Sequence, residues 1–218
     1  MSGSEILKHP RRNAAVTFVF VTVLIDMLSF GVIIPVLPHL IVQLIGGSIP
    51  KAAVWQSAFG TLFMLMQFVC SPIQGALSDR FGRRAVILIS CFGLGVDFIV
   101  MALTPVLWLL FLGRGISGMC AASNSTASAY VADITPREKR AAAFGLIGAA
   151  FGIGFVIGPA VGSALAHFGL RAPFWGAAFL SLVNFCFGLF VLPESLPKER
   201  RSVRIDWRHA NPLGSLLL

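Results

Sequence analysis

Charged side chains are scarce in this chain of 218 residues. Asp, Glu, Lys and Arg together make up 12% of the sequence, whereas hydrophobic residues make up 56%. Soluble domains usually carry about 25% charged residues, so the composition excludes an ordinary soluble domain and predicts an all-α integral membrane protein. Acidic residues are scarcer than basic ones, 9 against 17. Most of the basic residues lie in short segments between apolar runs, so membrane orientation explains the net charge better than a nucleic-acid partner does.

The sequence patterns of metal and nucleotide binding are also missing. None of the four cysteines belongs to a C-x-x-C pair, and all of them lie inside apolar stretches. We therefore interpret them as small packing residues and expect no metal site and no disulfide framework. The chain has no G-x-x-x-x-G-K-[ST] loop, which argues against transport driven by nucleotide hydrolysis. We expect no organic cofactor and no enzymatic activity. The cysteines are Cys70, Cys91, Cys120 and Cys186.

Long apolar segments dominate what is present. A helix needs roughly 20 apolar residues to cross a bilayer, and six segments meet this length. We predict a six-helix transmembrane domain over residues 14–192, with a cytoplasmic N-terminus at 1–13 and a cytoplasmic linker, interrupted midway, at 193–218. The expected spans are Ala14–Pro38, Val54–Leu77, Ala85–Leu103, Val106–Tyr130, Ala141–Ala166 and Pro173–Leu192.

The basic residues predict an orientation for these spans. Fourteen of the 17 Lys and Arg residues fall on one side of the predicted bundle. Lys51 and Arg171 fall on the other side, and Arg114 lies within a span. Because Lys and Arg concentrate on the cytoplasmic side of membrane proteins, both termini are predicted to be cytoplasmic.

Three ionisable residues lie well inside the apolar segments: Asp26, Asp97 and Arg114. A charge near the bilayer centre costs at least ~2.5 kcal/mol, so each of them needs a partner or a water-filled cavity. The helical rise of about 1.5 Å per residue places Asp97 and Arg114 at similar depth on either side of the short Thr104-Pro105 connection. They form either a structural ion pair or a substrate or proton site, and intramembrane charges favour the second interpretation.

Asp26 and the polar run after Arg114 are further candidates for a binding cavity. Asp26 lies near the middle of the first span, where a buried carboxylate can take up and release protons. Its alternative role is a packing acid bonded to a neighbouring hydroxyl. The fourth span contains Asn124 within a run of Ser, Thr and Ala residues, which suits a cavity wall or a close helix contact better than it suits lipid.

The most informative segment is Gly75-Ala-Leu-Ser-Asp79-Arg80-Phe-Gly82-Arg83-Arg84. Its glycines permit a very short reversal between two helices, and its arginines suit a lipid headgroup surface. The spacing G-x-x-x-D-R-x-G-R-R resembles the signature between the second and third helices of the major facilitator superfamily. The resemblance covers nearly the whole chain, and it implies the N-terminal six-helix half of a twelve-helix carrier.

The fifth span carries a second pattern of the same superfamily. Gly154, Gly158 and Gly162 recur every four residues, and Pro159 lies within their stripe. Such a stripe lets a neighbouring backbone approach closely. Together with Gly145 it resembles the antiporter motif of drug-exporting facilitators, although Ser163 stands in place of the final Gly. Generic small-residue packing is the alternative explanation.

Other short segments resemble the tetracycline/proton antiporter branch and its multidrug relatives, among them Pro35-Val-Leu-Pro38 and Leu192-Pro-Glu194-Ser. This resemblance implies drug and proton handling by Asp26, Asp97 and Arg114. It also implies a cytoplasmic gate network of Asp79, Arg80, Arg84 and Asp133. From the charges alone, we expect Asp133 to lie within ion-pair distance of Arg80 or Arg84.

The sequence thus predicts proton-coupled efflux of a tetracycline-like or other drug by alternating access, powered by a proton gradient in a bacterial inner membrane. The expected partners are a small-molecule drug, protons, the lipid bilayer, and either a second six-helix half or a second copy of the chain. Two alternatives remain. The first is a facilitator for a sugar or metabolite, against which the antiporter-like fifth span argues. The second is a six-helix assembly or interaction subunit that transports nothing.

Overall fold

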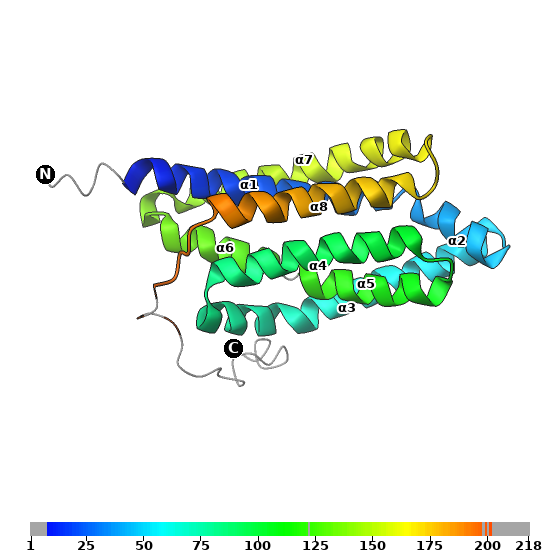
Figure 1. Cartoon of the computed structure of the whole chain (residues 1–218), viewed down its shortest axis with the longest axis horizontal. Coiled ribbons are helices and arrows are strands. Elements are labelled where there is room, and N and C mark those ends of the chain that lie inside the picture. Colours follow the sequence, from blue (N-terminus) through cyan, green and yellow to red (C-terminus); the bar gives the residue numbers. More distant parts are fainter. Residues whose placement is uncertain (1–7, 122, 198, 200, 202–218) are drawn as a thin grey trace, which may run out of the picture.

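The computed structural model describes residues 8–121, 123–197, 199 and 201, with side chains for 16–121, 125–197, 199 and 201. All regular elements in this described part are helical, as the sequence predicts (Figure 1). They are α1 (Lys8–Ile33), α2 (Leu37–Ile45), α3 (Ile49–Phe81), α4 (Arg83–Leu103), α5 (Leu107–Ala121), α6 (Ser123–Ile134), the 3-10 helix η1 (Arg137–Lys139), α7 (Arg140–Ala166) and α8 (Ala172–Val191).

Five regions of the described chain are helical, long and apolar enough to cross a membrane, and they comprise α1, α3, α4, η1 with α7, and α8. The fourth expected span, 106–130, corresponds to α5 and α6, which lie on either side of residue 122, a residue outside the described part of the chain. The first expected span was too long at its C-terminal end. α1 ends at Ile33, because Pro35 has no backbone N–H to continue the helix. The chain turns there and begins α2 with Pro38 in its first turn.

The turn between α3 and α4 is shorter than the glycine spacing predicted. α3 continues through Gly75 as far as Phe81, and Gly82 alone separates it from α4. Gly82 has a φ of 102°, a conformation that residues with a Cβ rarely adopt. The very short reversal that the sequence predicts is therefore present and depends on Gly82, whereas Gly75 is an ordinary helical residue.

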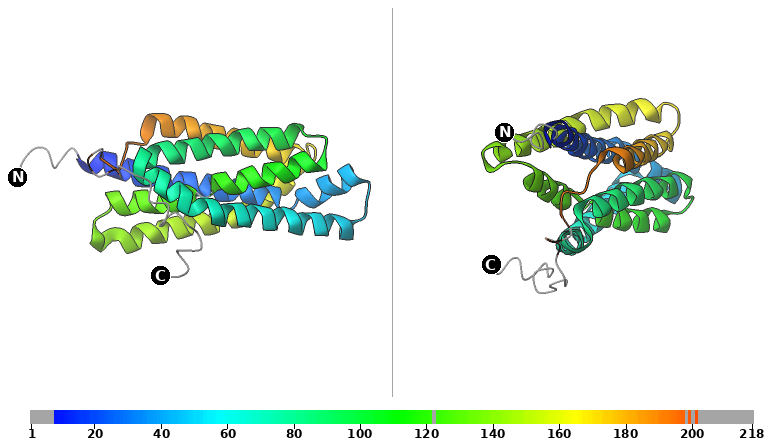
Figure 2. Two further views of the ribbon diagram at one scale, coloured as in Figure 1. Left: turned by 90° about the horizontal axis from the view of Figure 1, so that it is seen from below. Right: turned by 60° about the vertical axis from the view of Figure 1, so that its left-hand side comes forward.

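The long helices form two groups that run side by side (Figures 1 and 2). α1, α7 and α8 pack together on one side, and α3, α4 and α5 pack together on the other. The contact between α4 and α8 joins the two groups. Buried apolar side chains form two clusters, one around Leu40 and Phe59 and the other around Phe18 and Tyr130. Burial differs between the helices. In the most apolar stretch of α4, 61% of the residues are buried inside the bundle, whereas in the most apolar stretch of α3 only 11% are buried.

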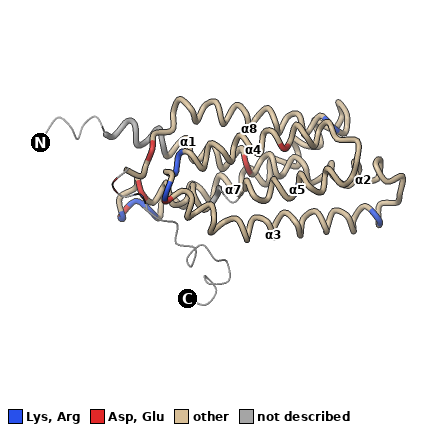
Figure 3. The backbone as a smooth tube through the Cα atoms, turned by 60° about the horizontal axis from the view of Figure 1, so that its bottom comes forward, with Lys and Arg blue, Asp and Glu red and all other residues tan. Residues whose placement is uncertain are grey.

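Basic residues gather at one end of the bundle (Figure 3). We call it the basic end and define it by the turn between α3 and α4, the segment from the end of α6 to the start of α7, and residues 192–197 after α8. Lys51 and Arg171, which the sequence placed on the other side, lie at the starts of α3 and α8 at the opposite end. The helical connectivity thus separates the charges as the loop pattern predicts. The cytoplasmic assignment of the basic end stays a prediction.

Candidate functional site: a cavity between the two helix groups

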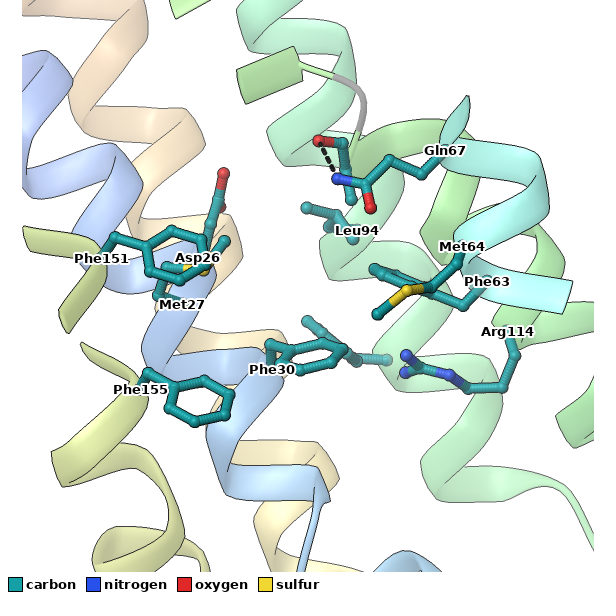
Figure 4. A pocket seen from close by; sticks show the side chains of 12 residues that line it. Asp26, Met27, Phe30, Phe63, Met64, Gln67, Leu94, Arg114, Phe151 and Phe155 are labelled. Carbon is teal, nitrogen blue, oxygen red and sulfur yellow. Dashed lines mark hydrogen bonds between the residues drawn. The ribbon is translucent and has the colours of Figure 1, made fainter. Parts of the chain in front are cut away.

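A cavity of about 360 Å³ lies between α1, α3, α4, α5 and α7 (Figure 4). Both helix groups contribute to its walls, so the cavity exists only because the groups lie side by side. Most of its wall is apolar and aromatic, but Asp26, Gln67 and Arg114 also line it. Its apolar walls include Met27, Phe30, Phe63, Met64, Leu94 and Phe155.

Asp26 enters this cavity from α1 (Figure 4). Its Oδ1 atom is buried and has no hydrogen-bond partner in the described part of the structure. Among the described residues no hydroxyl donates a hydrogen bond to Asp26, so the geometry gives the packing alternative no support. A buried carboxylate oxygen without a partner is costly. Asp26 therefore leaves one acceptor without a donor at the wall of this cavity.

Arg114 enters the same cavity from α5, facing α1 and α3 (Figure 4). Its side chain is 5% exposed. The guanidinium carbon lies 4.7 Å from the ring centroid of Phe63 and 5.9 Å from that of Phe30. Aromatic faces attract cations at these distances, so the two rings stabilise a charge that the apolar wall would otherwise disfavour. The sequence predicted Arg114, but it gave no signal that Phe30 and Phe63 would hold it.

Asp97 and Arg114 do not form an ion pair, although their similar depth in the bundle would allow one. Ser117 on α5 donates a hydrogen bond to Asp97 Oδ2, and Asp97 Oδ1 has no hydrogen-bond partner in the described part of the structure. Asp97 is absent from the wall of the central cavity and instead lines a separate space between α4 and α5. The reason is helical direction, since adjacent residues of α5 point to different sides: Gly113 faces Asp97, whereas Arg114 faces the cavity.

One further polar residue lines this cavity. Gln67, on α3, donates a hydrogen bond of 3.5 Å to the backbone oxygen of Ala121 (Figure 4). The sequence analysis did not select Gln67, although an amide inside the apolar second span was a usable signal. Asn124 lies within α6, but its side chain is outside the described part of the structure.

A charge network at the basic end centres on Arg83. Its Nη2 lies 2.9 Å from Asp79 Oδ1 and its Nε lies 2.8 Å from Asp133 Oδ2. Its Nη1 donates a hydrogen bond of 2.9 Å to Ser78 Oγ. One guanidinium therefore joins α3 to α6 at the start of α4. Such forked contacts suit arginine better than lysine, because the planar group presents several donors in fixed directions.

The expected pairing of Asp133 with Arg80 or Arg84 was therefore wrong, because Arg83 holds this acid. Arg84 instead donates a hydrogen bond of 2.7 Å to the backbone oxygen of Leu189 on α8. Arg80 lies against the ring of Phe81, with 5.3 Å between its guanidinium carbon and the ring centroid. The helical start of α4 at Arg83 decides which arginine faces Asp79 and Asp133, and that start was not visible in the loop pattern.

Glu194 attaches the segment after α8 to this network. Its Oε1 atom accepts hydrogen bonds from the backbone N–H groups of Arg83, Ser195 and Leu196. Its Oε2 atom lies 3.5 Å from Arg201 Nη2. Arg83 is the first residue of α4, where free N–H groups favour an anion. Glu194 therefore caps α4 from a distant part of the sequence.

Gly154, Gly158 and Gly162 of α7 face α1. A Cβ atom on Gly154 would lie 2.8 Å from Leu24 O, and a Cβ atom on Gly162 would collide with the backbone oxygen of Val32. In contrast, a Cβ atom on Gly145 would meet no atom within 4 Å. The stripe therefore lets α1 and α7 approach at backbone distance, while Gly145 lies outside the contact. The stripe sets the position of α1, the helix that carries Asp26.

Comparison with known proteins agrees with this architecture. The sequence profile of the Major Facilitator Superfamily matches residues 19–216. The chain belongs to the major facilitator superfamily. Its all-helical arrangement, with charged turns at one end and a cavity between two helix groups, is consistent with the N-terminal half of the facilitator fold.

Individual facilitators show how close the relationship is. The class C tetracycline resistance protein of Escherichia coli is 42% identical over 205 residues, which cover 94% of this chain and 51% of that protein. Multidrug resistance protein 2 of Bacillus subtilis is 33% identical over 181 residues, covering 82% of this chain and 44% of that protein. Among solved structures, the human organic anion transporter MFSD10 (TETRAN) superimposes with a TM-score of 0.83 at 29% identity, covering 94% of this chain and 54% of that one. The chain spans about half the length of these facilitators.

Proposed function

We propose that this chain is one half of a proton-coupled drug efflux carrier that works by alternating access. The observation that carries the proposal is Asp26 Oδ1, a buried carboxylate oxygen without a partner at the edge of a cavity that also contains Arg114. A proton and a drug are both able to supply the missing partner, and a group that can bind only one of them at a time couples the two. Asp97, next to the cavity, is the second candidate for proton handling.

The cavity supports a drug-sized substrate. Its volume of about 360 Å³ lies within the range of roughly 300–1,000 Å³ that is typical of small-molecule sites. Aromatic and thioether side chains line most of it, and such surfaces accommodate flat, partly apolar ligands of varied shape. The names of the bacterial relatives point to the same class, since they are tetracycline and multidrug resistance proteins. We therefore propose a tetracycline-like compound or another drug as the substrate.

The remaining part of the cavity comes from a partner. α3 and α7 are long apolar helices of which little is buried: 11% and 22% of the residues in their most apolar stretches. They expose large apolar side chains such as Phe68 and Phe151. We propose that a second six-helix half, or a second copy of the chain, covers them. Residues 193–218 would then begin the cytoplasmic linker between the halves. The proton gradient of a bacterial inner membrane is the proposed energy source, and no organic cofactor takes part.

A substitution at Asp26 tests this mechanism. In a carrier that joins this chain to a second six-helix half, Asp26→Asn should abolish drug efflux driven by the proton gradient and leave membrane insertion intact. The amide keeps the shape of the carboxyl group but exchanges no proton. Efflux by the Asn variant at the rate of the unchanged carrier would remove Asp26 from the mechanism.

Reconstitution tests whether one half is enough. The purified chain of 218 residues is placed in liposomes with an imposed pH gradient, and drug uptake is measured together with the oligomeric state. We expect no uptake by the monomer, because it offers one wall of the cavity. Uptake by a species shown to be monomeric would contradict the half-carrier proposal. A stable assembly that never transports, with either partner, would favour an interaction subunit.

A further inference from the structure

The central cavity contains a buried cation whose hydrogen-bond donors are not used. Arg114 is 5% exposed, and no hydrogen bond or ion pair joins its guanidinium group to another described residue. Its nitrogen atoms keep surface that is open to the cavity. Figure 4 shows the group extending from α5 toward the middle of this space. The N–H donors of Arg114 are therefore accessible to a molecule that occupies the cavity.

The neighbouring side chains stabilise the charge of Arg114 but accept no hydrogen bond from it. The rings of Phe30 and Phe63 attract the cation, and a ring offers no oxygen atom to an N–H donor. Asp97 acts on the charge at longer range, because its carboxylate meets Ser117 and forms no ion pair with the guanidinium. A buried donor without an acceptor is costly, so an occupant that brings an acceptor is favoured.

The opposite wall of the cavity determines where a negative group can lie. Asp26 enters from α1, on the far side of the space from Arg114 (Figure 4), and no ion pair joins the two side chains. A negative group beside Asp26 would meet another acid. At the α5 wall it would instead meet Arg114, the only Lys or Arg among the residues that line this cavity. The two walls therefore orient a substrate with its negative end toward α5.

We propose that the central cavity selects substrates that carry a deprotonated oxygen group, and that Arg114 binds this group. The chemical class is an aromatic carboxylate or the enolate of a β-dicarbonyl compound. Either group presents two oxygens side by side, which match the planar fork of a guanidinium. A neutral amide offers one carbonyl oxygen and forms a weaker hydrogen bond. This inference rests on the proposed function, because it names the charge of the substrate of the same cavity.

Three ligands with the same ring system test the charge that the cavity selects. The full chain in detergent at pH 7 is titrated with 1-naphthaleneacetate, with its neutral amide 1-naphthaleneacetamide, and with 2-(1-naphthyl)ethylammonium. Binding is measured by isothermal titration calorimetry. We expect the carboxylate to bind at least about tenfold more tightly than the other two, because hydrogen bonds between ionised groups are about twice as strong as neutral ones. Equal binding of all three ligands, or tighter binding of the ammonium compound, would overturn the proposal.

Arginine variants locate the group that selects the charge. Arg114→Gln should remove the preference for the carboxylate. Arg114→Lys keeps the charge but not the fork, so it should retain only part of the preference. Arg80→Gln is the matched control, because it also removes one positive charge and Arg80 does not line the cavity. The preference should be unchanged in this control. A preference that survives in Arg114→Gln would exclude Arg114 as the binding group.

A second pair of variants tests the site if Arg114→Gln does not fold. Met64→Trp fills the cavity from an exposed position, whereas Leu65→Trp adds the same ring at an exposed neighbour that does not line the cavity. Because overpacking is costly, Met64→Trp should weaken carboxylate binding at least about tenfold, and Leu65→Trp should leave it unchanged. Unchanged binding in Met64→Trp would exclude the central cavity. These results are separate from the carrier mechanism, because binding without preference for the carboxylate overturns the substrate charge, whereas the efflux experiment with Asp26→Asn tests proton coupling.

Discussion

Gly31 on α1 and Gly158 on α7 meet backbone to backbone. A Cβ atom on Gly31 would lie 2.9 Å from the Cα of Gly158, and a Cβ atom on Gly158 would lie 2.7 Å from the Cα of Gly31. Neither position has room for a methyl group unless the helices move apart. Since Asp26 lies on α1 less than two turns from Gly31, this contact fixes how far the acid reaches into the central cavity.

Replacing Gly158 should therefore destabilise the bundle, whereas the same change on the open side of α7 should not. Gly158→Ala places a methyl group against the backbone of α1, and such overpacking costs about 1–3 kcal/mol. Gly148→Ala is the control, because a Cβ atom there meets nothing within 4 Å. An exposed helical Gly→Ala change raises stability by up to about 1 kcal/mol. Thermal unfolding of the purified chain in detergent should shift downward for Gly158→Ala and stay level or rise for Gly148→Ala. Equal shifts would contradict the close contact.

The charge network at the basic end should depend on Arg83 and not on Arg80. Arg83→Lys keeps the charge but cannot contact Asp79, Asp133 and Ser78 at once. Hydrogen bonds to charged groups contribute about 1.5–3 kcal/mol each, and partial exposure of this site places the expected loss of stability near the lower value. Arg80→Lys is the control, since Arg80 has no ion pair in the described part of the structure. The measurement is thermal unfolding at low and high salt. A larger effect of Arg80→Lys would restore the pairing that the sequence suggested.

The cap on α4 should fail when Glu194 loses its charge. Glu194→Gln weakens the hydrogen bonds from the backbone of Arg83 and Leu196, because a neutral acceptor holds them less strongly. We expect amide hydrogen exchange at Arg83, Ser195 and Leu196 to rise about tenfold. Glu199→Gln is the control, since Glu199 is exposed and makes no such contact with the residues that the structure describes. Unchanged exchange in the Glu194 variant would show that the segment after α8 does not hold the start of α4.

The aromatic support of Arg114 gives a prediction for drug binding. Phe63→Leu keeps an apolar side chain but removes the ring that lies 4.7 Å from the guanidinium carbon. A desolvated cation–π contact contributes up to about 2 kcal/mol, so tetracycline affinity of a carrier containing this half should fall by roughly 2- to 30-fold. Phe179→Leu is the control, since Phe179 is an exposed residue of α8 that does not line the central cavity. Binding can be followed by tetracycline fluorescence. If both variants bind equally well, the ring does not position Arg114 for the drug.

The sequence determined the class of this protein and the helices that carry its charges. Hydropathy fixed the apolar segments, because each must satisfy its backbone hydrogen bonds within itself to cross a bilayer. Three features could be recognised in the sequence alone: the facilitator signature at Gly82, the glycine stripe of α7 and the charges inside apolar segments. The all-helical membrane fold and the superfamily are confirmed, and Asp26 and Arg114 do lie on one cavity.

Tertiary structure alone decided which side chains meet. The sequence placed Asp97 and Arg114 at the same depth, but Asp97 meets the face of α5 that carries Gly113 and Ser117, whereas Arg114 turns to the central cavity, so they do not pair. It named Arg80 and Arg84 for Asp133, but Arg83 holds that acid, and Glu194 joins the network from 111 positions away in the chain. Spacing along one helix fixes the depth of a side chain in the bundle to within one helical turn. The direction of a side chain depends on where each helix begins and on which neighbour packs against it, and only the assembled bundle sets both.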